Sequence, residues 1–199
     1  MRPQLLIVVP TLNSYLLLPR LVTSLQEQSW SHWRVLFVDG PSESKHRNWL
    51  QHCCEHEQRC RWVEQSPSEV GIFGAMNQGF EAAADDDWLL FWGSDDWAAS
   101  STVLAELMAR LESSDPSTVR SSVEWPHILV CSGRYVNAAT GDLGRATVFH
   151  KPPGVLAAEI YRRALILGCS PPHQATLFGP AARRSLGRYA DGFLLSADL

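Results

Sequence analysis

The sequence predicts an α/β fold in which a mostly parallel β-sheet is flanked by helices. Two continuous apolar runs, Leu5–Val9 and Val35–Val38, are typical of strands that are buried on both faces of a parallel sheet. Between these runs, apolar residues recur at helical spacing over Tyr15–Gln28. This order of strand, helix and strand indicates parallel strands that are joined by helical crossovers.

The same alternation continues along the chain. Ser44–Gln58 has the character of a second helix, and Arg61–Glu64 that of a third strand. A further helix over Ala75–Ala84 is expected after the glycine-rich stretch that begins at Gly71. The remaining expected elements are a strand within Trp88–Trp97, a loop over Ser113–Pro126, a strand over His127–Ser132, a turn-rich return over Gly133–Gly144, an edge strand over Thr147–His150, and helices over Val155–Gly168 and Ala181–Leu186.

Composition limits the classes to which the protein can belong. The 199 residues are 45% apolar and 19% charged, which is typical of one globular domain. Lys and Arg number 17 against 21 Asp and Glu, a net charge of −4, and they form no basic block, so nucleic acid is not an expected partner. The chain contains no run of eighteen apolar residues and begins with no signal-peptide pattern, so we expect no transmembrane segment.

The cysteines indicate a reducing compartment. Their number is odd, 5, and no Cys-x-x-Cys pair is present, which favours a cytoplasmic protein over a disulfide framework. His52 and His56 are four residues apart and so share one face of the expected helix, and together with Cys53 they raise the alternative of a zinc site. Because no second ligand pair has metal spacing, we interpret them as a solvated helix face.

The most informative stretch is Trp88–Trp97, in which an apolar strand ends at Gly93 and is followed by Asp95 and Asp96. Ligands of open α/β sheets bind at the carboxyl ends of strands. Two adjacent carboxylates repel each other unless a hard divalent cation neutralises them, so this strand end is a candidate metal site. The alternative is that Asp96 caps a helix over Ala98–Leu111.

Polar residues also follow the first two strands. Pro10, Thr11 and Asn13 come directly after the first, and Asp39 ends the second. An ionised carboxylate only accepts hydrogen bonds, so Asp39 suits a nucleobase imide or a ribose hydroxyl, although an Asp-Gly turn is the favoured explanation when Asp39 is considered alone. Glycines at 71, 74 and 79 would let backbone approach a diphosphate at the start of a helix.

Four segments that follow one another along the chain resemble, in their order and spacing, those of the family 2 glycosyltransferases. These are inverting enzymes of the GT-A fold (a Rossmann-like α/β fold) with nucleotide-sugar donors. The resemblance runs from Leu5 to the last residue and is strongest to bacterial transferases that build surface polysaccharides. The matching segments are Val9–Asn13, Val38–Gly40, Gly71–Gly79 and Phe91–Asp96.

The resemblance implies roles for the donor-side residues. Pro10, Thr11, Asn13 and Asp39 would hold the base and ribose, most simply of a UDP-sugar. The loop from Gly71 to Asn77 would lie along the ribose and diphosphate. Asp95 and Asp96 match the family's metal motif, with Asp96 as the more direct ligand of Mg²⁺ or Mn²⁺, since oxygen ligands suit hard ions.

The resemblance also implies acceptor-side roles. Inversion requires a general base opposite the leaving group, and Asp198 stands where the family has that carboxylate. A solvated terminal acid is the alternative for Asp198. His173 matches a segment near the acceptor and would bind a hydroxyl or a phosphate, with an ordinary loop histidine as the alternative.

Two features depart from the family's pattern. Gly74 replaces a usual aspartate and Gln78 a usual lysine, and the chain ends one residue after Asp198. We therefore expect one GT-A domain with a nucleotide-sugar-binding half over 1–97, a small acceptor-side mixed region within 98–199, and a shortened C-terminal end.

The expected function is transfer of a sugar, with inversion, to a saccharide or lipid-linked acceptor in surface polysaccharide synthesis. The alternative is a nucleotide-sugar-binding remnant with impaired catalysis. The expected location is the cytoplasm, with peripheral association at the inner membrane through a lipid-linked acceptor. A nucleotidyltransferase is disfavoured, because a glycine-rich loop with Arg and Lys does not follow the first strand.

Overall fold

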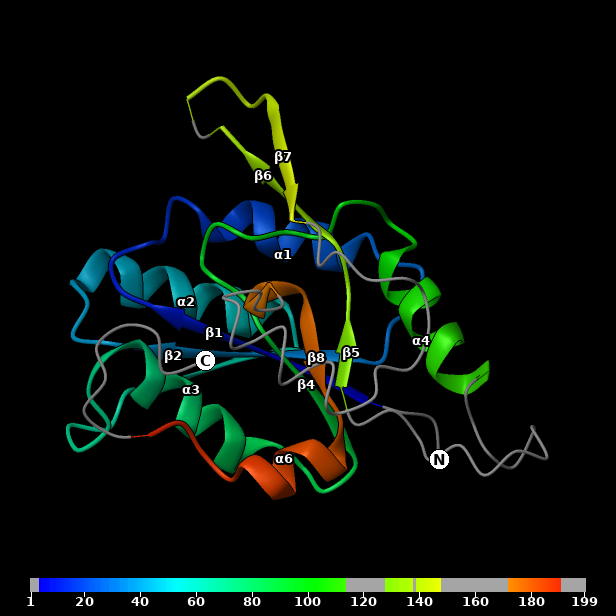
Figure 1. The fold of residues 1–199 in the computed structure, drawn as a ribbon. Helices are drawn as coiled ribbons and strands as arrows, with labels where there is room; N and C mark the ends of the chain where they lie inside the picture. Colours follow the sequence, from blue (N-terminus) through cyan, green and yellow to red (C-terminus); the bar gives the residue numbers. More distant parts are fainter. Residues whose placement is uncertain (1–3, 114–127, 138, 148–171, 191–199) are drawn as a thin grey trace.

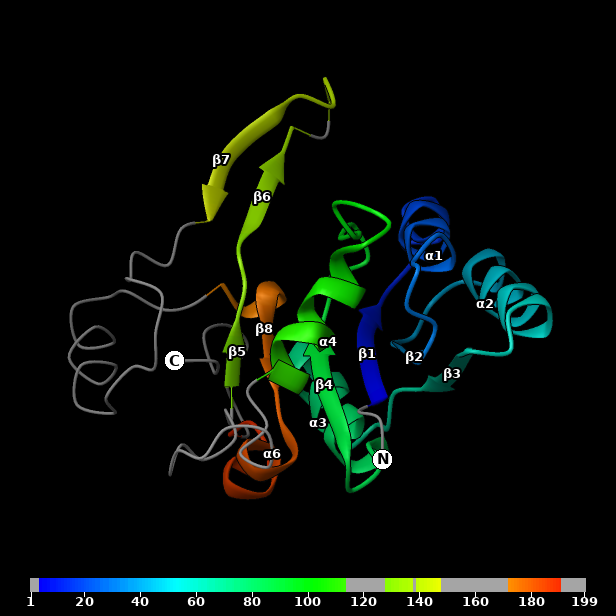
Figure 2. The same ribbon diagram turned by 90° about the vertical axis from the view of Figure 1, so that its right-hand side faces the viewer.

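A computed structural model of the chain describes residues 4–113, 128–137, 139–147 and 172–190. Its centre is a six-stranded sheet in the order β3-β2-β1-β4-β8-β5, and a separate pair, β6 and β7, forms a hairpin that extends beyond it (Figures 1 and 2). The strands are β1 Gln4–Thr11, β2 Trp33–Asp39, β3 Cys60–Glu64, β4 Asp87–Phe91, β5 Ile128–Val130, β6 Gly133–Val136, β7 Leu143–Thr147 and β8 Thr176–Phe178.

The strand directions confirm the expected α/β class. Strands β3, β2, β1 and β4 pair in parallel. Strand β8 is antiparallel to both β4 and β5, so β5 runs in the same direction as the four parallel strands. The sheet is therefore mostly parallel, and the carboxyl ends of β1, β2 and β4 meet at one edge.

Helices cover both faces of the sheet. Figure 1 shows α1 and α2 on one face and α3 and α6 on the other. Helix α4 belongs to the first face, because its apolar residues share a core cluster with those of α1 and α2. The helices are α1 Leu18–Gln26, α2 Ser44–His56, α3 Gly71–Ala82, α4 Val103–Ser113, α6 Pro180–Leu186 and the 3₁₀ turn His173–Ala175.

The continuous apolar runs are explained by these two faces. Successive side chains of a strand point to opposite sides. In β1, Leu5, Ile7 and Val9 enter the core under α1 and α2. Leu6 and Val8 enter the core under α3. A strand that is covered on both faces has no solvent-facing position to break the run.

Three expectations need correction. Helix α3 begins at Gly71 rather than Ala75 and ends at Ala82. Helix α4 begins at Val103 rather than Ala98, because residues 98–102 form a loop, so Asp96 does not cap it. The expected turn over Gly133–Gly144 is mostly the β6–β7 hairpin.

Strand β8 was not expected as a strand, whereas helix α6 agrees with the expected Ala181–Leu186. The predictions for 114–126 and 148–168, and for Asp198, lie outside the described residues. Among the described helices, none has the length and apolar character that a membrane span requires.

Candidate functional site

The candidate site lies where the strand order reverses. Strand β1 has β2 on one side and β4 on the other, and the connections run in opposite directions from it. Such a switch point opens a crevice at the carboxyl ends of the strands. Thr11 is in register with Asp39, and Val8 with Phe91, so the loop that carries Asp95 and Asp96 leaves the sheet beside the end of β1.

Asp39 ends β2 as an almost fully buried carboxylate, with 1% of its surface exposed. Its Oδ1 accepts hydrogen bonds from Thr11 Oγ1 at 3.0 Å and from Ser42 Oγ at 2.6 Å. His46 Nε2 lies 3.1 Å from the same oxygen. Three polar groups therefore converge on Oδ1 and fix the carboxylate in one orientation.

The second oxygen of Asp39 is differently placed. Oδ2 is buried and has no hydrogen-bond partner in the described part of the chain, and Arg47 Nε is 3.8 Å away. Burial lowers the pKa of His46, although the neighbouring Asp39 opposes that shift. Asp39 therefore keeps Oδ2 as an acceptor that an N–H or O–H group of a ligand can satisfy.

The loop after β1 is tied to both neighbouring strand ends. Asn13 has a positive φ of 53°, and its side-chain oxygen accepts a hydrogen bond from the Glu43 N–H at 2.8 Å. Ser14 Oγ donates to Ser94 Oγ at 2.8 Å, and Ser94 Oγ donates to the Pro10 carbonyl at 3.2 Å. These bonds join the loops after β1, β2 and β4 into one polar rim.

Asp95 and Asp96 both turn toward the break that follows β4. A Cβ added to Gly93 would lie 2.8 Å from Asp95 Oδ1 and 3.3 Å from Asp96 Oδ2, so a larger residue at this position would displace the carboxylates from where they now lie. The Gly93 N–H donates to Asp96 Oδ2 at 2.6 Å. Burial raises the pKa of the Asp96 carboxyl to about 6, the Asp95 charge adds to this, and the Gly93 hydrogen bond opposes it.

This pair fits a divalent metal by its chemistry. Asp95 is exposed and Asp96 half-buried, and neither forms an ion pair within the described residues. A partly desolvated carboxylate next to a second one is stabilised in its charged form by a cation. Magnesium-like ions commonly use one or two carboxylates together with phosphate oxygens and water, which matches two acids at the switch point of the sheet.

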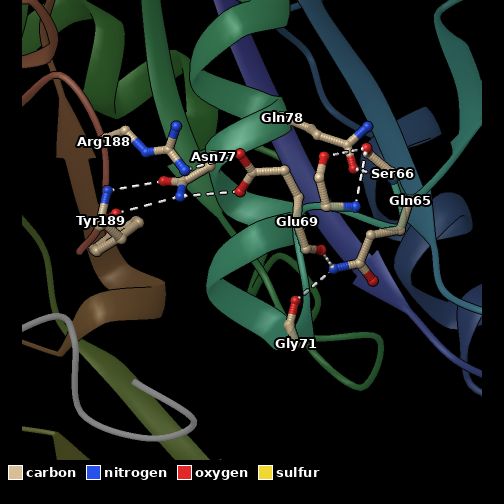
Figure 3. A network of polar contacts seen from close by, with 9 residues as sticks. Gln65, Ser66, Glu69, Gly71, Asn77, Gln78, Arg188 and Tyr189 are labelled. Carbon is tan, nitrogen blue, oxygen red and sulfur yellow. Dashed lines mark hydrogen bonds and ion pairs between the residues drawn. The ribbon is translucent and has the colours of Figure 1, made fainter. Parts of the chain in front are cut away.

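A third group of polar residues holds the start of α3 (Figure 3). Gln65 Nε2 donates to the Gly71 carbonyl at 2.6 Å, and the Ser66 N–H donates to Gln78 Oε1 at 2.8 Å. Asn77 is buried, and its Oδ1 accepts from the Tyr189 N–H at 2.8 Å. In this structure the Asn77 amide therefore links α3 to the segment after α6.

The two substitutions within α3 that depart from the family's pattern, Gly74 and Gln78, have structural reasons. A Cβ at Gly74 would lie 2.3 Å from the Glu69 backbone, so the 65–70 loop sits where a side chain would otherwise project. Gln78 holds that loop through its bond to Ser66. Glu69 also pairs with Arg188 at 2.8 Å. The 65–70 loop is therefore held against α3 by close backbone packing at Gly74 and by the side-chain amide of Gln78.

His173 lies beside the end of β4, on the α3 side of the sheet. Its ring stacks on Phe91, with centroids 5.4 Å apart and an interplanar angle of 21°. Its Nε2 and the Tyr189 hydroxyl are hydrogen-bonded at 2.5 Å. The Trp92 indole N–H donates to the Gln174 carbonyl at 3.1 Å, which fixes the same segment against β4.

The structure brings most of the candidate residues to one edge. Pro10, Thr11 and Asp39 are the last residues of β1 and β2, and Asn13, Asp95 and Asp96 lie on the loops that follow β1 and β4. His173 lies at the adjoining end of β4, and Gly71 and Asn77 lie at α3. Asp198 is outside the described residues. The sequence interpretation missed four polar residues, Ser42, His46, Ser94 and Tyr189. Ser94 and Tyr189 bond to residues that are distant in the chain, whereas Ser42 and His46 lie within seven residues of their partner Asp39.

Comparison with known proteins agrees with this geometry. Residues 6–140 match the model of glycosyl transferase family 2, so the chain belongs to that family. The glycosyltransferases of PGL/p-HBAD biosynthesis from Mycobacterium bovis (strain BCG / Pasteur 1173P2) and Mycobacterium tuberculosis (strain ATCC 25177 / H37Ra) are each 29% identical to it over 115 residues. The match covers 58% of this chain and 44% of each relative, so it spans less than half of their length.

Solved structures support the GT-A fold. The structure of S. aureus TarS 1-349 in complex with UDP has a TM-score of 0.69 and 17% identity, over 98% of this chain and 52% of that one. The same protein in complex with UDP-GlcNAc gives a TM-score of 0.66 and 18% identity, over 94% and 48%. The expected fold class, a mostly parallel sheet flanked by helices in the manner of GT-A glycosyltransferases, is thus confirmed.

Proposed function

We propose that this chain transfers a sugar from a UDP-sugar to a saccharide or lipid-linked acceptor, with inversion, in the synthesis of a surface polysaccharide or glycolipid. The observation that carries the proposal is the pair of Asp95 and Asp96 at the switch point of a family 2 fold, with the Asp96 pKa raised to about 6 by burial. The biosynthetic role in the names of the mycobacterial relatives supports a glycan or glycolipid product. The UDP complexes of the similar fold favour UDP.

The donor base is proposed to bind at the end of β2. Asp39 Oδ2 is a buried acceptor without a hydrogen-bond partner in the described chain, and it would accept the imide N–H of uracil or a ribose hydroxyl. Thr11 and Ser42 hold the carboxylate through its other oxygen, which leaves Oδ2 for a group of the ligand. Pro10 and Thr11 at the end of β1, and Asn13 in the loop that follows, would contact the same base and ribose.

The diphosphate is proposed to lie between β1 and β4. Asp96 and Asp95 would hold Mg²⁺ or Mn²⁺ there, and the Gly71–Asn77 segment would lie along the ribose and diphosphate. The bound ion would offset the charge that develops on the leaving UDP. Asp96 supplies the half-buried ligand and Asp95 the exposed one.

The reaction balances without a further co-reactant. The acceptor oxygen bonds to the anomeric carbon, and the bond from that carbon to the UDP oxygen breaks with its electron pair staying on UDP. The acceptor proton passes to a general base, for which Asp198 is the proposed group. His173, whose imidazole is held by Phe91 and Tyr189, is proposed to bind an acceptor hydroxyl or phosphate.

The proposed division of the chain follows from these roles. Residues 1–97 would form the nucleotide-sugar half, and 98–199 the acceptor half. We further propose a cytoplasmic location, with peripheral contact at the inner membrane when the acceptor is lipid-linked.

The experiment that tests the proposal measures UDP release from a panel of UDP-sugars, with Mn²⁺ and with a chelator. We expect metal-dependent release that Asp96→Asn abolishes, and that Asp198→Asn reduces while donor binding persists. The control is Asp86→Asn, which alters an exposed acid directly before the N-terminal end of β4, away from the proposed metal site. Donor binding without release by the unaltered chain would favour the nucleotide-sugar-binding remnant, and an absence of metal-dependent donor binding would refute the site.

A further inference from the structure

The last turn of α2 places three metal-ligating side chains on one exposed helix face. His52, Glu55 and His56 each offer a ligand atom, and these atoms all lie within 4.8 Å of one another. The two imidazole centroids are 4.1 Å apart. We propose that this His52–Glu55–His56 cluster binds a divalent transition-metal ion, with Zn²⁺ as the best match, at a site separate from the proposed donor site.

The spacing of the three residues already suits a tetrahedral ion. Positions i, i+3 and i+4 of a helix lie on the same face. Metal bonds of about 2.0–2.1 Å in a tetrahedron set neighbouring ligand atoms roughly 3.4 Å apart. Because the three side chains are exposed, they can move from within 4.8 Å to this separation by small changes in side-chain torsion, without movement of the backbone.

One of the two histidines is oriented for coordination by the helix itself. His56 Nδ1 lies 2.8 Å from the His52 carbonyl oxygen. A carbonyl only accepts, so Nδ1 carries the hydrogen and the lone pair of the neutral ring is on Nε2. A hydrogen bond from the second ring nitrogen of a metal-binding histidine commonly fixes its tautomer and raises its basicity.

The charges around the cluster favour a cation. It lies at the C-terminal end of α2, where the helix dipole is negative, and Glu55 adds a full negative charge. Gln51 Nε2 donates to Glu55 Oε1 at 3.0 Å and so orients that carboxylate. Arg59, three residues after His56, is paired with Glu57 at 2.8 Å and lies over the Trp33 ring at 3.7 Å.

The ligand types separate this site from the carboxylates after β4. Two imidazoles and one carboxylate suit Zn²⁺ and its neighbours in the first transition row, whereas Asp95 and Asp96 offer only oxygen. His46, which lies beside Asp39, precedes His52 by six residues and His56 by ten, a rise of about 9 to 15 Å along the helix, so the cluster is separate from Asp39. The sequence grouped His52 and His56 with Cys53, but the structure packs Cys53 against the core and supplies Glu55 instead.

The test is calorimetric titration of the tag-free chain with Zn²⁺ in a background that carries Asp95→Asn and Asp96→Asn, so that the donor-side acids do not contribute. We expect one ion per chain, and we expect His52→Ala and His56→Ala each to weaken binding about tenfold or more. Both positions are exposed on a helix, where alanine is well tolerated. His32→Ala, an exposed histidine in the loop before β2, is the matched control.

A second measurement separates imidazole ligands from thiolates. Co²⁺ is added to the same proteins, and the near-ultraviolet charge-transfer band that reports cobalt–thiolate bonds is recorded. The proposal predicts a cobalt spectrum without that band, which is lost in His56→Ala. A thiolate band, unchanged affinity in both histidine variants, or an equal loss in His32→Ala would overturn it.

Discussion

The ends of β2 and β4 both carry aspartates, but the protein treats them in opposite ways. At the end of β2, Asp39 is buried at 1% exposure and receives two hydrogen bonds and a histidine contact on one oxygen. After β4, Asp96 is half-buried, has one backbone donor and faces a second carboxylate. The protein holds the Asp39 carboxylate in one orientation and leaves Oδ2 as an acceptor for a ligand group. Within the described residues, no cationic side chain forms an ion pair with Asp96.

The difference assigns separate tasks to the two strand ends. A carboxylate that is held rigidly with one free acceptor position selects a ligand by hydrogen-bond geometry. A carboxylate whose pKa is raised by burial gains from a positive ion. Binding at the β2 end should therefore be independent of metal, and binding at the β4 end should depend on it.

The largest expected effect is on the β4 end. Asp96→Asn removes the half-buried metal ligand, so UDP affinity in Mn²⁺ should fall roughly a hundredfold, to the level without metal. Calorimetry with UDP measures this loss. Asp86→Asn, an exposed acid just before β4, should leave the affinity unchanged, and an equal loss there would break the comparison.

Asp39→Asn tests the β2 end. Asparagine keeps the oxygen that accepts from Thr11 and Ser42, but it can place an NH₂ group where Oδ2 now offers an acceptor. We expect UDP affinity to fall about tenfold, equally with and without Mn²⁺, since one hydrogen bond to a charged group is lost. A loss confined to Mn²⁺-containing samples would contradict the division of tasks.

Thr11→Val tests how much the hydrogen bond from Thr11 to Asp39 contributes to the stability of the fold. The change keeps the side-chain shape but removes the hydroxyl that donates to Asp39, so the free energy of unfolding should fall by about 1–2 kcal/mol. Urea denaturation measures it. Thr23→Val, on the exposed face of α1, should change stability by less than about 0.5 kcal/mol.

The smallest expected effect is a pH dependence that belongs to Asp96. Its pKa of about 6 in the folded protein exceeds the ordinary 3.8, so the folded state binds the proton more tightly. Without metal, the contribution of Asp96 to stability is therefore present at low pH and is lost as pH rises from about 4 to 6, on the order of 1 kcal/mol after solvent screening.

Asp96→Asn should remove this slope and leave the metal-free protein more stable at neutral pH. Denaturation of both proteins between pH 4 and 7 measures the difference. Mn²⁺ should also bind more weakly below pH 6, because protons compete for Asp96. A slope that is the same in both proteins would mean that other groups cause it.

The sequence was sufficient to predict those parts of the fold that depend on neighbouring residues, such as continuous apolar runs and the polar residues at strand ends. The runs Leu5–Val9 and Val35–Val38 are buried on both faces, and this is why they contain no polar position. Strand ends in a parallel sheet share one edge, so Thr11, Asp39 and Asp95 could be grouped from order alone. The start of α3 was missed because glycines at 71 and 74 have low helix propensity, while contact with Glu69 requires the second of them.

Long-range partners were beyond such reasoning. The Tyr189 N–H donates to Asn77 across 112 residues, and neither segment contains a sequence pattern that predicts this contact. His46 lies only seven residues from Asp39, yet its role depends on α2 turning back over the end of β2. The β6–β7 hairpin has exposed Tyr135 and Leu143 and no clear alternation, so its strands gave no signal.

The most direct test of the division between the two strand ends is calorimetric titration of the unaltered chain with UDP, first in a chelator and then in Mn²⁺. The account predicts weak binding without metal, from contacts at Asp39, and an affinity about a hundredfold higher with Mn²⁺, from Asp95 and Asp96. Equal affinity in the two conditions would contradict it, because the raised pKa of Asp96 would then have no link to nucleotide binding.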